Sequence, residues 1–541
     1  MRQERRSIGI FRGTASGLAV LAVAAALIGT QAGAITPADL AFRQAVSEEV
    51  TGKDAVAAFY KARDYAPIWT SAADAARRGA VLDAMERAGE HGLPDGVHDV
   101  AALRAAFANV ASERQRGRLE AEMTEAYLAY AHDVSTGFVT PSKIDAGLVR
   151  EVPVKAPGYL LAGIAGTDPA AFLRSLPPHM PQYDALRRAR FDLAATVTAG
   201  GWGAEVPARD LGPGDTGEAV VALRDRLIRM GYLGRTASAV YDSDIQKAVQ
   251  AFQIDHGITP DGVAGKGTIA EINVGAADRL GAVLVAMERL RWMNGLPLGK
   301  RHVWVNLPDF TAKIVDDGKV TFETVSVIGM DQNDRRSPEF SDQMEFMVVN
   351  PTWNVPRSIT VKEYLPMLQK NPRAAGHLKI VDRRGRVVDR DATDFTQFTE
   401  RNFPFSMSQP PSDGNALGLV KFMFPNKWNI YLHDTPSKSL FQKEVRAFSH
   451  GCIRLGQPFD FAYALLAPQT DDPRGLFKQH LDTRSENTIK LETPVPVHLV
   501  YFTAFPDARG RIEYRRDIYG RDRRILDAMK AAGVVLPEVQ G

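Results

Sequence analysis

Cysteine, net charge and long apolar segments are all scarce in this sequence. The 541 residues contain one cysteine, Cys452, which excludes an internal disulfide bond. The 66 basic residues are offset by 64 acidic ones, so the formal net charge is only +2. Proteins that bind nucleic acids normally carry a basic excess or a basic stripe. We therefore expect no nucleic acid among the partners.

The one pronounced apolar run lies near the start of the chain. Arg2, Arg5 and Arg6 precede the run at residues 18–28, and small residues follow it at 32–34. This order is typical of a secretory signal peptide, and the run is shorter than the roughly 20 residues that span a bilayer. We predict that residues 1–34 are a signal peptide and that the protein is exported. An uncleaved N-terminal membrane anchor is the alternative.

The remaining length predicts several folded units of a multidomain α+β protein. A domain usually has roughly 100 to 200 residues, which suggests about three units after export. Residues 35–207 are Ala-rich with helical periodicity and predict a helical scaffold domain, completed by residues 275–299. In residues 208–274, apolar positions recur at helical intervals between glycine-rich turns, for example Val220, Leu223 and Leu227. This pattern predicts a small three-helix bundle.

From residue 300 the periodicity changes from helix to strand. Val303, Val305 and Leu307 alternate with Trp304 and Asn306, as in a half-buried strand. We predict a mainly β catalytic domain over residues 300–510. At about residues 358–412 the pattern breaks into charged, proline-containing segments, which predicts an inserted cap of helix and loop. Residues 511–541 are expected to form a C-terminal tail.

The chemistry is expected around Cys452. An exported protein keeps an unpaired thiol in an oxidising compartment, where it is a liability unless it is used. The alternating segment 428–433 predicts a strand that ends at His433, 19 residues before the cysteine, so a strand, loop and return would bring imidazole and thiol together. From these residues alone, a buried structural thiol and a metal site remain alternatives. A fourth-ligand pattern such as CxxC or HExxH is lacking, so we expect no metal and no cofactor.

A catalytic interpretation assigns each residue a role. Cys452 would be the nucleophile that forms a thioester, and His433 would donate and accept the proton. Gly451 has no side chain to block its backbone, so its amide would contribute to an oxyanion hole. His450 would support the site. Arg454, Tyr431 and Ser449 are predicted substrate-binding residues, Arg454 through a substrate carboxylate or as a brace of the loop.

Two stretches resemble known families. The motifs of the 208–274 segment resemble the peptidoglycan-binding domain type 1; they are Gly214-Asp215-Thr216-Gly217, Gly231-Tyr232-Leu233, Ala251-Phe252-Gln253 and Asp261-Gly262-Val263-Ala264-Gly265. His433 followed by Ser449-His450-Gly451-Cys452-Ile453-Arg454-Leu455 is similar to the signature of L,D-transpeptidase catalytic domains of the YkuD type. Segments 305–308, 350–356, 421–426 and 494–505 extend the resemblance to the larger YcbB-like branch, which combines a scaffold domain, an inserted peptidoglycan-binding domain and a capped catalytic domain.

The resemblance implies an activity and a location. In such enzymes the cysteine attacks a tetrapeptide stem after its third residue, releases the terminal D-alanine and passes the acyl group to a diaminopimelate amine. It also implies a wall-associated protein in the periplasm, peptidoglycan stem peptides and glycan strands as partners, and acylation of Cys452 by carbapenems. Penicillin-binding proteins and D,D-carboxypeptidases are further expected partners. An L,D-carboxypeptidase using the same thioester, or a non-catalytic wall-binding scaffold, is the alternative.

Overall fold

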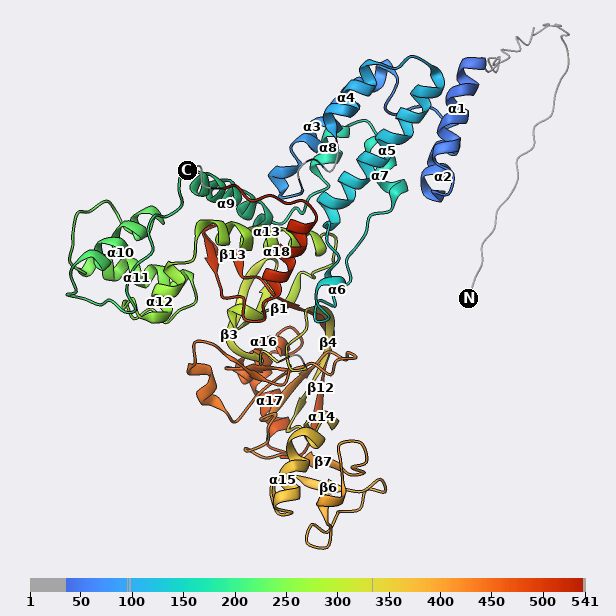
Figure 1. The fold of residues 1–541 in the computed structure, drawn as a ribbon. Coiled ribbons are helices and arrows are strands. Elements are labelled where there is room, and N and C mark those ends of the chain that lie inside the picture. Colours follow the sequence, from blue (N-terminus) through green and yellow to red (C-terminus); the bar gives the residue numbers. More distant parts are fainter. Residues whose placement is uncertain (1–35, 95, 97–98, 333, 539–541) are drawn as a thin grey trace, which may run out of the picture.

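The computed structural model describes residues 36–94, 96, 99–332 and 334–538. The predicted signal peptide lies outside these residues. In the described part of the chain, no helix is long and apolar enough to cross a lipid bilayer. Helices dominate the N-terminal half and strands the C-terminal half, as the α+β prediction requires, and this prediction is confirmed. Figure 1 shows an N-terminal helical body, a small helical bundle on the other side of the molecule, and a β domain with a projecting unit below them.

The N-terminal helices share one hydrophobic core around the long helix α5. Glu120 of α5 is fully buried, and its carboxylate accepts hydrogen bonds from the backbone N–H groups of Ile68, Trp69 and Thr70. A buried carboxylate is stable only when it is hydrogen-bonded, so these bonds fix the α2–α3 connection on α5. The helices of this core are α1 (Pro37–Glu49), α2 (Asp54–Ala62), α3 (Ala75–Glu86), α4 (Val100–Ala108), α5 (Glu113–Thr136), α7 (Pro157–Ile164) and α8 (Pro169–Arg174). The short helix α6 (Pro141–Ile144) packs through Ile144 against a different core.

A second core joins three helices that are far apart in the sequence: α9 (Pro181–Thr198), α13 (Ala276–Trp292) and α18 (Arg521–Ala531). The hairpin of β13 (Ala504–Pro506) and β14 (Ile512–Tyr514) packs there too. The segment that we expected to be a C-terminal tail is therefore part of a folded core. Ile525 and Met529 lie one helical turn apart, and both are fully buried in this core. Residues 511–538 consequently complete the scaffold.

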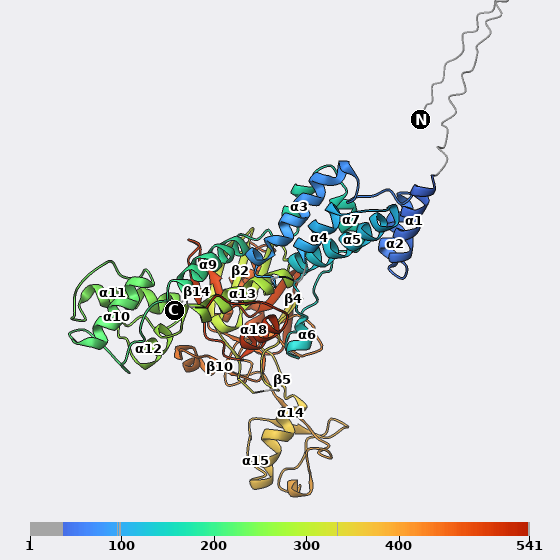
Figure 2. The same cartoon turned by 45° about the horizontal axis from the view of Figure 1, so that its top comes forward.

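The predicted three-helix bundle consists of α10 (Glu218–Arg229), α11 (Ser243–Asp255) and α12 (Lys266–Ile272). Val220, Leu223 and Leu227 are fully buried in its core. The β13–β14 hairpin holds the bundle: Arg511 Nε lies 2.6 Å from Asp255 Oδ2, and Arg515 Nη1 donates to the Asp255 carbonyl over 3.0 Å. In both views the bundle and helices α1–α5 lie on opposite sides of α9 and α13 (Figures 1 and 2).

The β domain is built on a sheet that closes on itself. The strand order is β10-β3-β11-β9-β8-β4-β12-β1-β2, and β2 also pairs with β3. Phe461 of α16 (Pro458–Leu466) is fully buried in the core of this sheet, 4.8 Å from the ring of Phe422 between centroids. The strands are β1 (Arg301–Asn306), β2 (Thr311–Asp316), β3 (Lys319–Gly329), β4 (Phe340–Val349), β8 (Val420–Met423), β9 (Leu432–His433), β10 (Ala447–Ser449), β11 (Ile453–Leu455) and β12 (Asn487–Val500), with α17 (Pro473–Leu481) beside α16.

The region expected as a cap falls within a small unit that has its own core. Its sheet has the order β5-β7-β6, and its helical segment contains a π-helical turn, Thr360–Tyr364, between α14 and α15. Pro366 follows this turn and has no N–H to donate, which explains the locally irregular helix. Figures 1 and 2 show the unit projecting from the rest of the β domain. Its elements are β5 (Trp353–Asn354), α14 (Arg357–Ile359), α15 (Leu365–Lys370), β6 (Lys379–Val381) and β7 (Ser406–Gln409).

Two buried histidines make the fold sensitive to acid. Burial lowers the pKa of His498 to about 4, and burial followed by the charge of Arg279 lowers the pKa of His256 well below its ordinary value. At a pH below the ordinary histidine pKa near 6.5, these side chains are protonated in the unfolded chain but stay neutral in the folded chain. The unfolded chain therefore binds more protons, and stability falls as the pH falls. We predict that the free energy of unfolding decreases from pH 7 to pH 5, by up to about 1.4 kcal/mol per histidine and pH unit, and that the midpoint of thermal unfolding falls with it.

His498 allows a direct check by thermal denaturation across this pH range. Its Nε2 donates to the Leu298 carbonyl and its Nδ1 accepts from Ser341 Oγ, at 2.9 and 2.8 Å. Glutamine can make similar bonds without titrating. The His498→Gln variant should therefore show a shallower pH dependence than the wild type, and an equal slope in the two proteins would contradict the prediction.

Candidate active site

Three neighbouring strands bring the predicted site residues onto one face of the sheet. His433 of β9 is in register with Arg454 of β11 on one side and with Lys421 of β8 on the other. Cys452 precedes Arg454 by two residues and therefore points to the same face. Strand geometry puts the Cα atoms of Cys452 and His433 about 8 Å apart. Leu432, Ile453 and Phe422 point into the core from the opposite face.

A cavity of about 640 Å³ covers this face. Its floor includes the strand residues just described, and its walls include cap residues such as Trp353, Ile359 and Glu363. All predicted site residues line the cavity except Gly451: Tyr431, His433, Ser449, His450, Cys452 and Arg454. The structure therefore brings together residues that the sequence places in two separate segments.

The Cys452 thiol is protonated at neutral pH in this structure. Its Sγ donates to the Asn429 carbonyl over 3.5 Å. Burial raises the pKa of Cys452 to about 11, although the backbone N–H and hydroxyl of Tyr431 and the positive charges of Arg454 and Lys421 favour the thiolate. Desolvation thus outweighs the nearby cations.

His433 is neutral in the same conditions and has a defined tautomer. Burial, followed by the charge of Arg454, lowers the pKa of His433 to about 3. Its Nδ1 donates to the Asp434 carbonyl, which leaves the lone pair on Nε2. In the described part of the chain, no hydrogen bond joins His433 to Cys452. In this state a neutral imidazole does not lower the thiol pKa, because His433 is buried beside the charge of Arg454. Cys452 is half-buried at the cavity surface.

The loop before Cys452 is fixed by Ser449. Its Oγ donates to the Cys452 carbonyl over 2.5 Å and accepts from the Gly451 N–H over 3.1 Å. Gly451 has φ +114°, a conformation that strains any residue with a side chain. The Gly451 amide, expected in the oxyanion hole, already has Ser449 Oγ as its partner and would have to exchange it. Ser449 is buried and holds the loop, and it also lines the cavity, so its contact with substrate stays a prediction.

Arg454 and Lys421 give the cavity a positive floor. The Nε of Arg454 is buried without a hydrogen-bond partner among the described residues. A buried guanidinium in this state is suited to bind a carboxylate of a ligand. Sequence analysis did not select Lys421 as a site residue. The alternation of Lys421 with buried Val420 and Phe422 was a usable signal, but the pairing of β8 with β9 was needed to place it beside His433.

The cap reaches the nucleophile loop through Glu363 of the π-helical turn. Glu363 Oε1 lies 2.6 Å from His450 Nε2 and 2.7 Å from Arg335 Nη2. His450 therefore links the loop before Cys452 to the cap. Its supporting role in the site stays a prediction. No sequence signal indicated Glu363, because it is 87 residues from His450 and no local motif surrounds it.

Three domain families match this chain. The family described as "Scaffold domain" matches residues 54–189, "Putative peptidoglycan binding domain" matches 216–272, and "L,D-transpeptidase catalytic domain" matches 300–496. The catalytic match contains every predicted site residue. The matches agree with the helical scaffold, the three-helix bundle and the β domain.

A curated protein and two solved structures are also similar to the chain. "Putative L,D-transpeptidase" of Haemophilus influenzae is 33% identical over 227 residues, which are 41% of this chain and 45% of that protein. The chain thus spans less than half of that relative. L,D-transpeptidase structures from Xylanimonas cellulosilytica and Stackebrandtia nassauensis are each 17% identical, cover 55% and 54% of this chain and 100% and 96% of their own, and have TM-scores of 0.16 and 0.20. These scores are too low to support an argument.

Together, the fold and the domain matches define a chain of three matched domains. The chain contains an L,D-transpeptidase catalytic domain, joined to a scaffold domain and a peptidoglycan-binding domain, and the resemblance found in the sequence is confirmed. The domain that contains Cys452 and His433 is the one matched by the family described as "L,D-transpeptidase catalytic domain". Among the described residues there is no cluster of three or more His, Cys, Asp or Glu side chains that would hold a metal ion.

The raised pKa of Cys452 predicts how its alkylation depends on pH. Iodoacetamide reacts with the thiolate, so the rate should keep rising from pH 7 to pH 10 without a plateau near neutrality. Because Lys421 favours the thiolate, the Lys421→Met variant should shift this profile to higher pH. Mass spectrometry of the alkylated protein measures both rates.

Lys362→Met is the matched control for this experiment. Lys362 lines the same cavity but is paired with Asp334 at 2.6 Å and is not among the charges that act on the thiol. Its profile should follow the wild type. A wild-type plateau below pH 8 would show that Cys452 is a thiolate at rest and would contradict the prediction.

Proposed function

We propose that this protein is an L,D-transpeptidase that cross-links peptidoglycan through a Cys452 thioester, with a tetrapeptide stem as donor and a diaminopimelate amine as acceptor. The observation that carries the proposal is the shared face of Cys452, His433 and Arg454 in one cavity. A nucleophile, a neutral base and an unpaired cation are what acyl transfer from an anionic peptide requires.

In the proposed first step, Cys452 Sγ attacks the carbonyl carbon of the third stem residue, which is bonded to the terminal D-alanine. The thiol proton passes to His433 Nε2 as the carbon–sulfur bond forms, because the resting thiol is protonated and the imidazole is neutral. The imidazolium then gives this proton to the amine of the departing D-alanine. The carbon–nitrogen bond breaks, and a thioester remains on Cys452.

In the second step the acceptor amine attacks the thioester. His433 Nε2 takes one proton from this amine and returns it to the sulfur as the carbon–sulfur bond breaks. The Cys452 amide, and the Gly451 amide after it leaves Ser449, would stabilise the oxyanion in both steps. Arg454 would bind a carboxylate of the stem, and Tyr431 lines the cavity beside the thiol.

A second cavity favours a reaction with two peptide substrates over hydrolysis. It measures about 490 Å³ and shares Glu363, His450 and Arg454 with the first. Donor and acceptor could thus approach the site from two sides, whereas an L,D-carboxypeptidase needs only water as acceptor. The peptidoglycan-binding bundle supports peptidoglycan as the partner. We further propose a periplasmic, wall-associated location, with D,D-carboxypeptidases supplying tetrapeptide stems and penicillin-binding proteins acting on the same wall.

Defined muropeptides test the reaction. The wild type incubated with disaccharide tetrapeptides should release D-alanine and form dimers, detected by mass spectrometry, and Cys452→Ser should form none. His433→Gln should reduce the rate at least about 100-fold, because general acid–base catalysis contributes this much. Tripeptide monomers without dimers would identify a carboxypeptidase instead, and a wild type that neither releases D-alanine nor forms dimers would support the non-catalytic scaffold. An equal dimer yield from Cys452→Ser would show that Cys452 is not the nucleophile.

Acylation by a carbapenem tests the nucleophile separately from the acceptor. Intact mass spectrometry should find one drug adduct on the wild type and none on Cys452→Ser. The adduct should form more slowly on His433→Ala, because the thiol then loses its base. A wild type that remains unmodified would mean that the thiol is inert, and the transpeptidase proposal would be abandoned.

A further inference from the structure

A serine far from the nucleophile in the sequence holds the peptide bond that precedes it. Ser337 Oγ donates to the Gly451 carbonyl over 2.6 Å, across 114 residues of sequence. Ser337 lies in the loop between β3 and β4 and is fully buried. The Gly451 carbonyl belongs to the same planar peptide group as the Cys452 N–H. In a trans peptide these two bonds point in opposite directions, so fixing the carbonyl also fixes the direction of the N–H.

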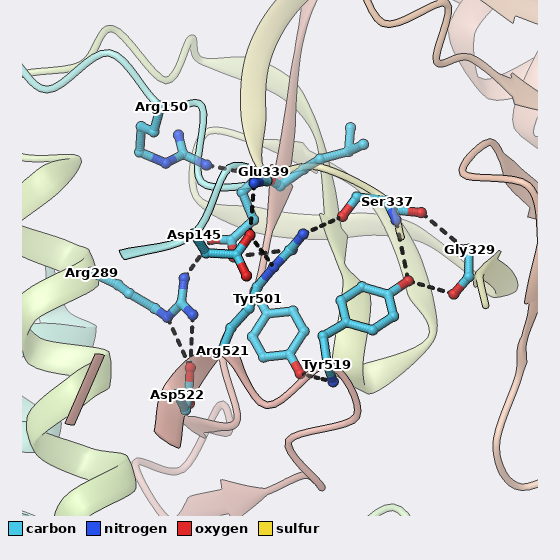
Figure 3. Close-up of polar contacts among 12 residues, drawn as sticks. Asp145, Arg150, Arg289, Gly329, Ser337, Glu339, Tyr501, Tyr519, Arg521 and Asp522 are labelled. Carbon is cyan, nitrogen blue, oxygen red and sulfur yellow. Dashed lines mark hydrogen bonds and ion pairs between the residues drawn. The ribbon is translucent and has the colours of Figure 1, made fainter. Parts of the chain in front are cut away.

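Ser337 is itself fixed by the C-terminal segment, as Figure 3 shows. The Tyr519 hydroxyl accepts from the Ser337 N–H over 3.3 Å, and Arg521 Nη2 donates to the Ser337 carbonyl over 2.9 Å. Ser337 Oγ also accepts from the Gly329 N–H over 3.0 Å, while the Tyr519 hydroxyl donates to the Gly329 carbonyl. All polar groups of Ser337 are therefore engaged.

The fit around this serine leaves little room for movement. A Cβ atom on Gly329 would lie 2.0 Å from the Arg335 carbonyl oxygen and 2.7 Å from the Ser337 nitrogen, so the loop packs directly on the backbone of β3. Tyr519 is fully buried, its ring is stacked on Tyr501 with centroids 5.6 Å apart, and its N–H donates to the Tyr501 hydroxyl over 2.8 Å. Packed interiors of this kind do not readily accommodate shifts.

A buried ion network connects this support to the scaffold. Arg521 Nη1 lies 3.3 Å from Glu339 Oε1, and Arg289 of α13 bonds both Glu339 and Asp522 (Figure 3). Removing one member of such a network leaves a buried charge uncompensated. The Ser337 hydroxyl that holds the Gly451 carbonyl is thus supported by residues of three elements outside the motif around Cys452. These elements are β3, α13 and α18.

We propose that Ser337, held by Tyr519 and Arg521, is a positioning residue that orients the Gly451–Cys452 peptide so that the Cys452 N–H faces the developing oxyanion. The inference rests on the proposed acyl transfer. Because the carbonyl accepts a hydrogen bond, the N–H of the same peptide is also a better donor. Ser337 touches no reacting atom and acts only through the backbone of the nucleophile.

The test compares two reactions of the same thiol. Acylation by a carbapenem passes through an oxyanion, whereas alkylation by iodoacetamide does not. Ser337→Ala should slow acylation about 10- to 100-fold, because a misdirected oxyanion donor costs no more than a deleted one. The rate of alkylation should change by less than about threefold. With tetrapeptide substrate, kcat should fall and KM should stay near the wild-type value. Tyr519→Phe, which keeps the Ser337 hydroxyl, should show the same pattern with a smaller loss.

Two scaffold variants control for the loss of a buried hydrogen bond. Ser135 Oγ donates to the Ala131 carbonyl over 2.6 Å and is fully buried, like Ser337. The Tyr127 hydroxyl donates to the buried Leu160 carbonyl over 2.9 Å. Ser135→Ala and Tyr127→Phe should lower thermal stability to a similar extent but leave the ratio of acylation to alkylation unchanged.

The outcomes separate this inference from the proposed function. If the wild type is acylated and Ser337→Ala loses both reactions equally, or neither, the positioning role is wrong and the transpeptidase proposal stands. If the wild type is not acylated, the proposed function fails and the positioning role fails with it. If Ser337→Ala does not fold, the ratio measured on Tyr519→Phe decides in the same way.

Discussion

The buried ion network of Arg289, Glu339, Arg521 and Asp522 is the constraint on which the rest of the structure depends. Each of these side chains is almost completely removed from water, and two positive charges face two negative ones. Burial alone would lower the pKa of Arg289. The charges of Glu339 and Asp522 raise this pKa, so the Arg289 guanidinium stays charged. Because an unpaired charge would be strongly destabilising there, helix α13, the start of β4 and helix α18 keep fixed relative positions.

This arrangement explains why an enzyme domain is completed by residues on both sides of it. The scaffold contributes Arg289 before the catalytic sheet begins, and the C-terminal segment contributes Tyr519 and Arg521 after it ends. Their hydrogen bonds converge on the β3–β4 loop, which touches the nucleophile loop through Ser337 and the cap through Arg335. Scaffold, cap and nucleophile therefore meet at one short loop.

Electrostatics and burial oppose each other at the candidate active site. The cations Arg454 and Lys421 favour a Cys452 thiolate, yet desolvation raises its pKa to about 11. The same burial and Arg454 keep His433 neutral. The resting site is thus an uncharged pair of side chains beside two cations. A carboxylate bound to Arg454 would offset one of these charges and so raise the pKa of His433, because Arg454 is one of the groups that lower it.

The sequence by itself determined the parts that depend on local patterns. Helical periodicity gave the scaffold and the three-helix bundle, strand alternation gave the β domain, and the motif around Cys452 named the residues that line the cavity. Only the tertiary structure decided the rest. Glu363 is 87 residues from His450, Ser337 is 114 residues from Gly451 and Tyr519 is 190 residues from Gly329. No local pattern encodes such pairings. The neutral state of Cys452 and His433 likewise follows from burial and from cations on neighbouring strands, and both exist only once the sheet has closed.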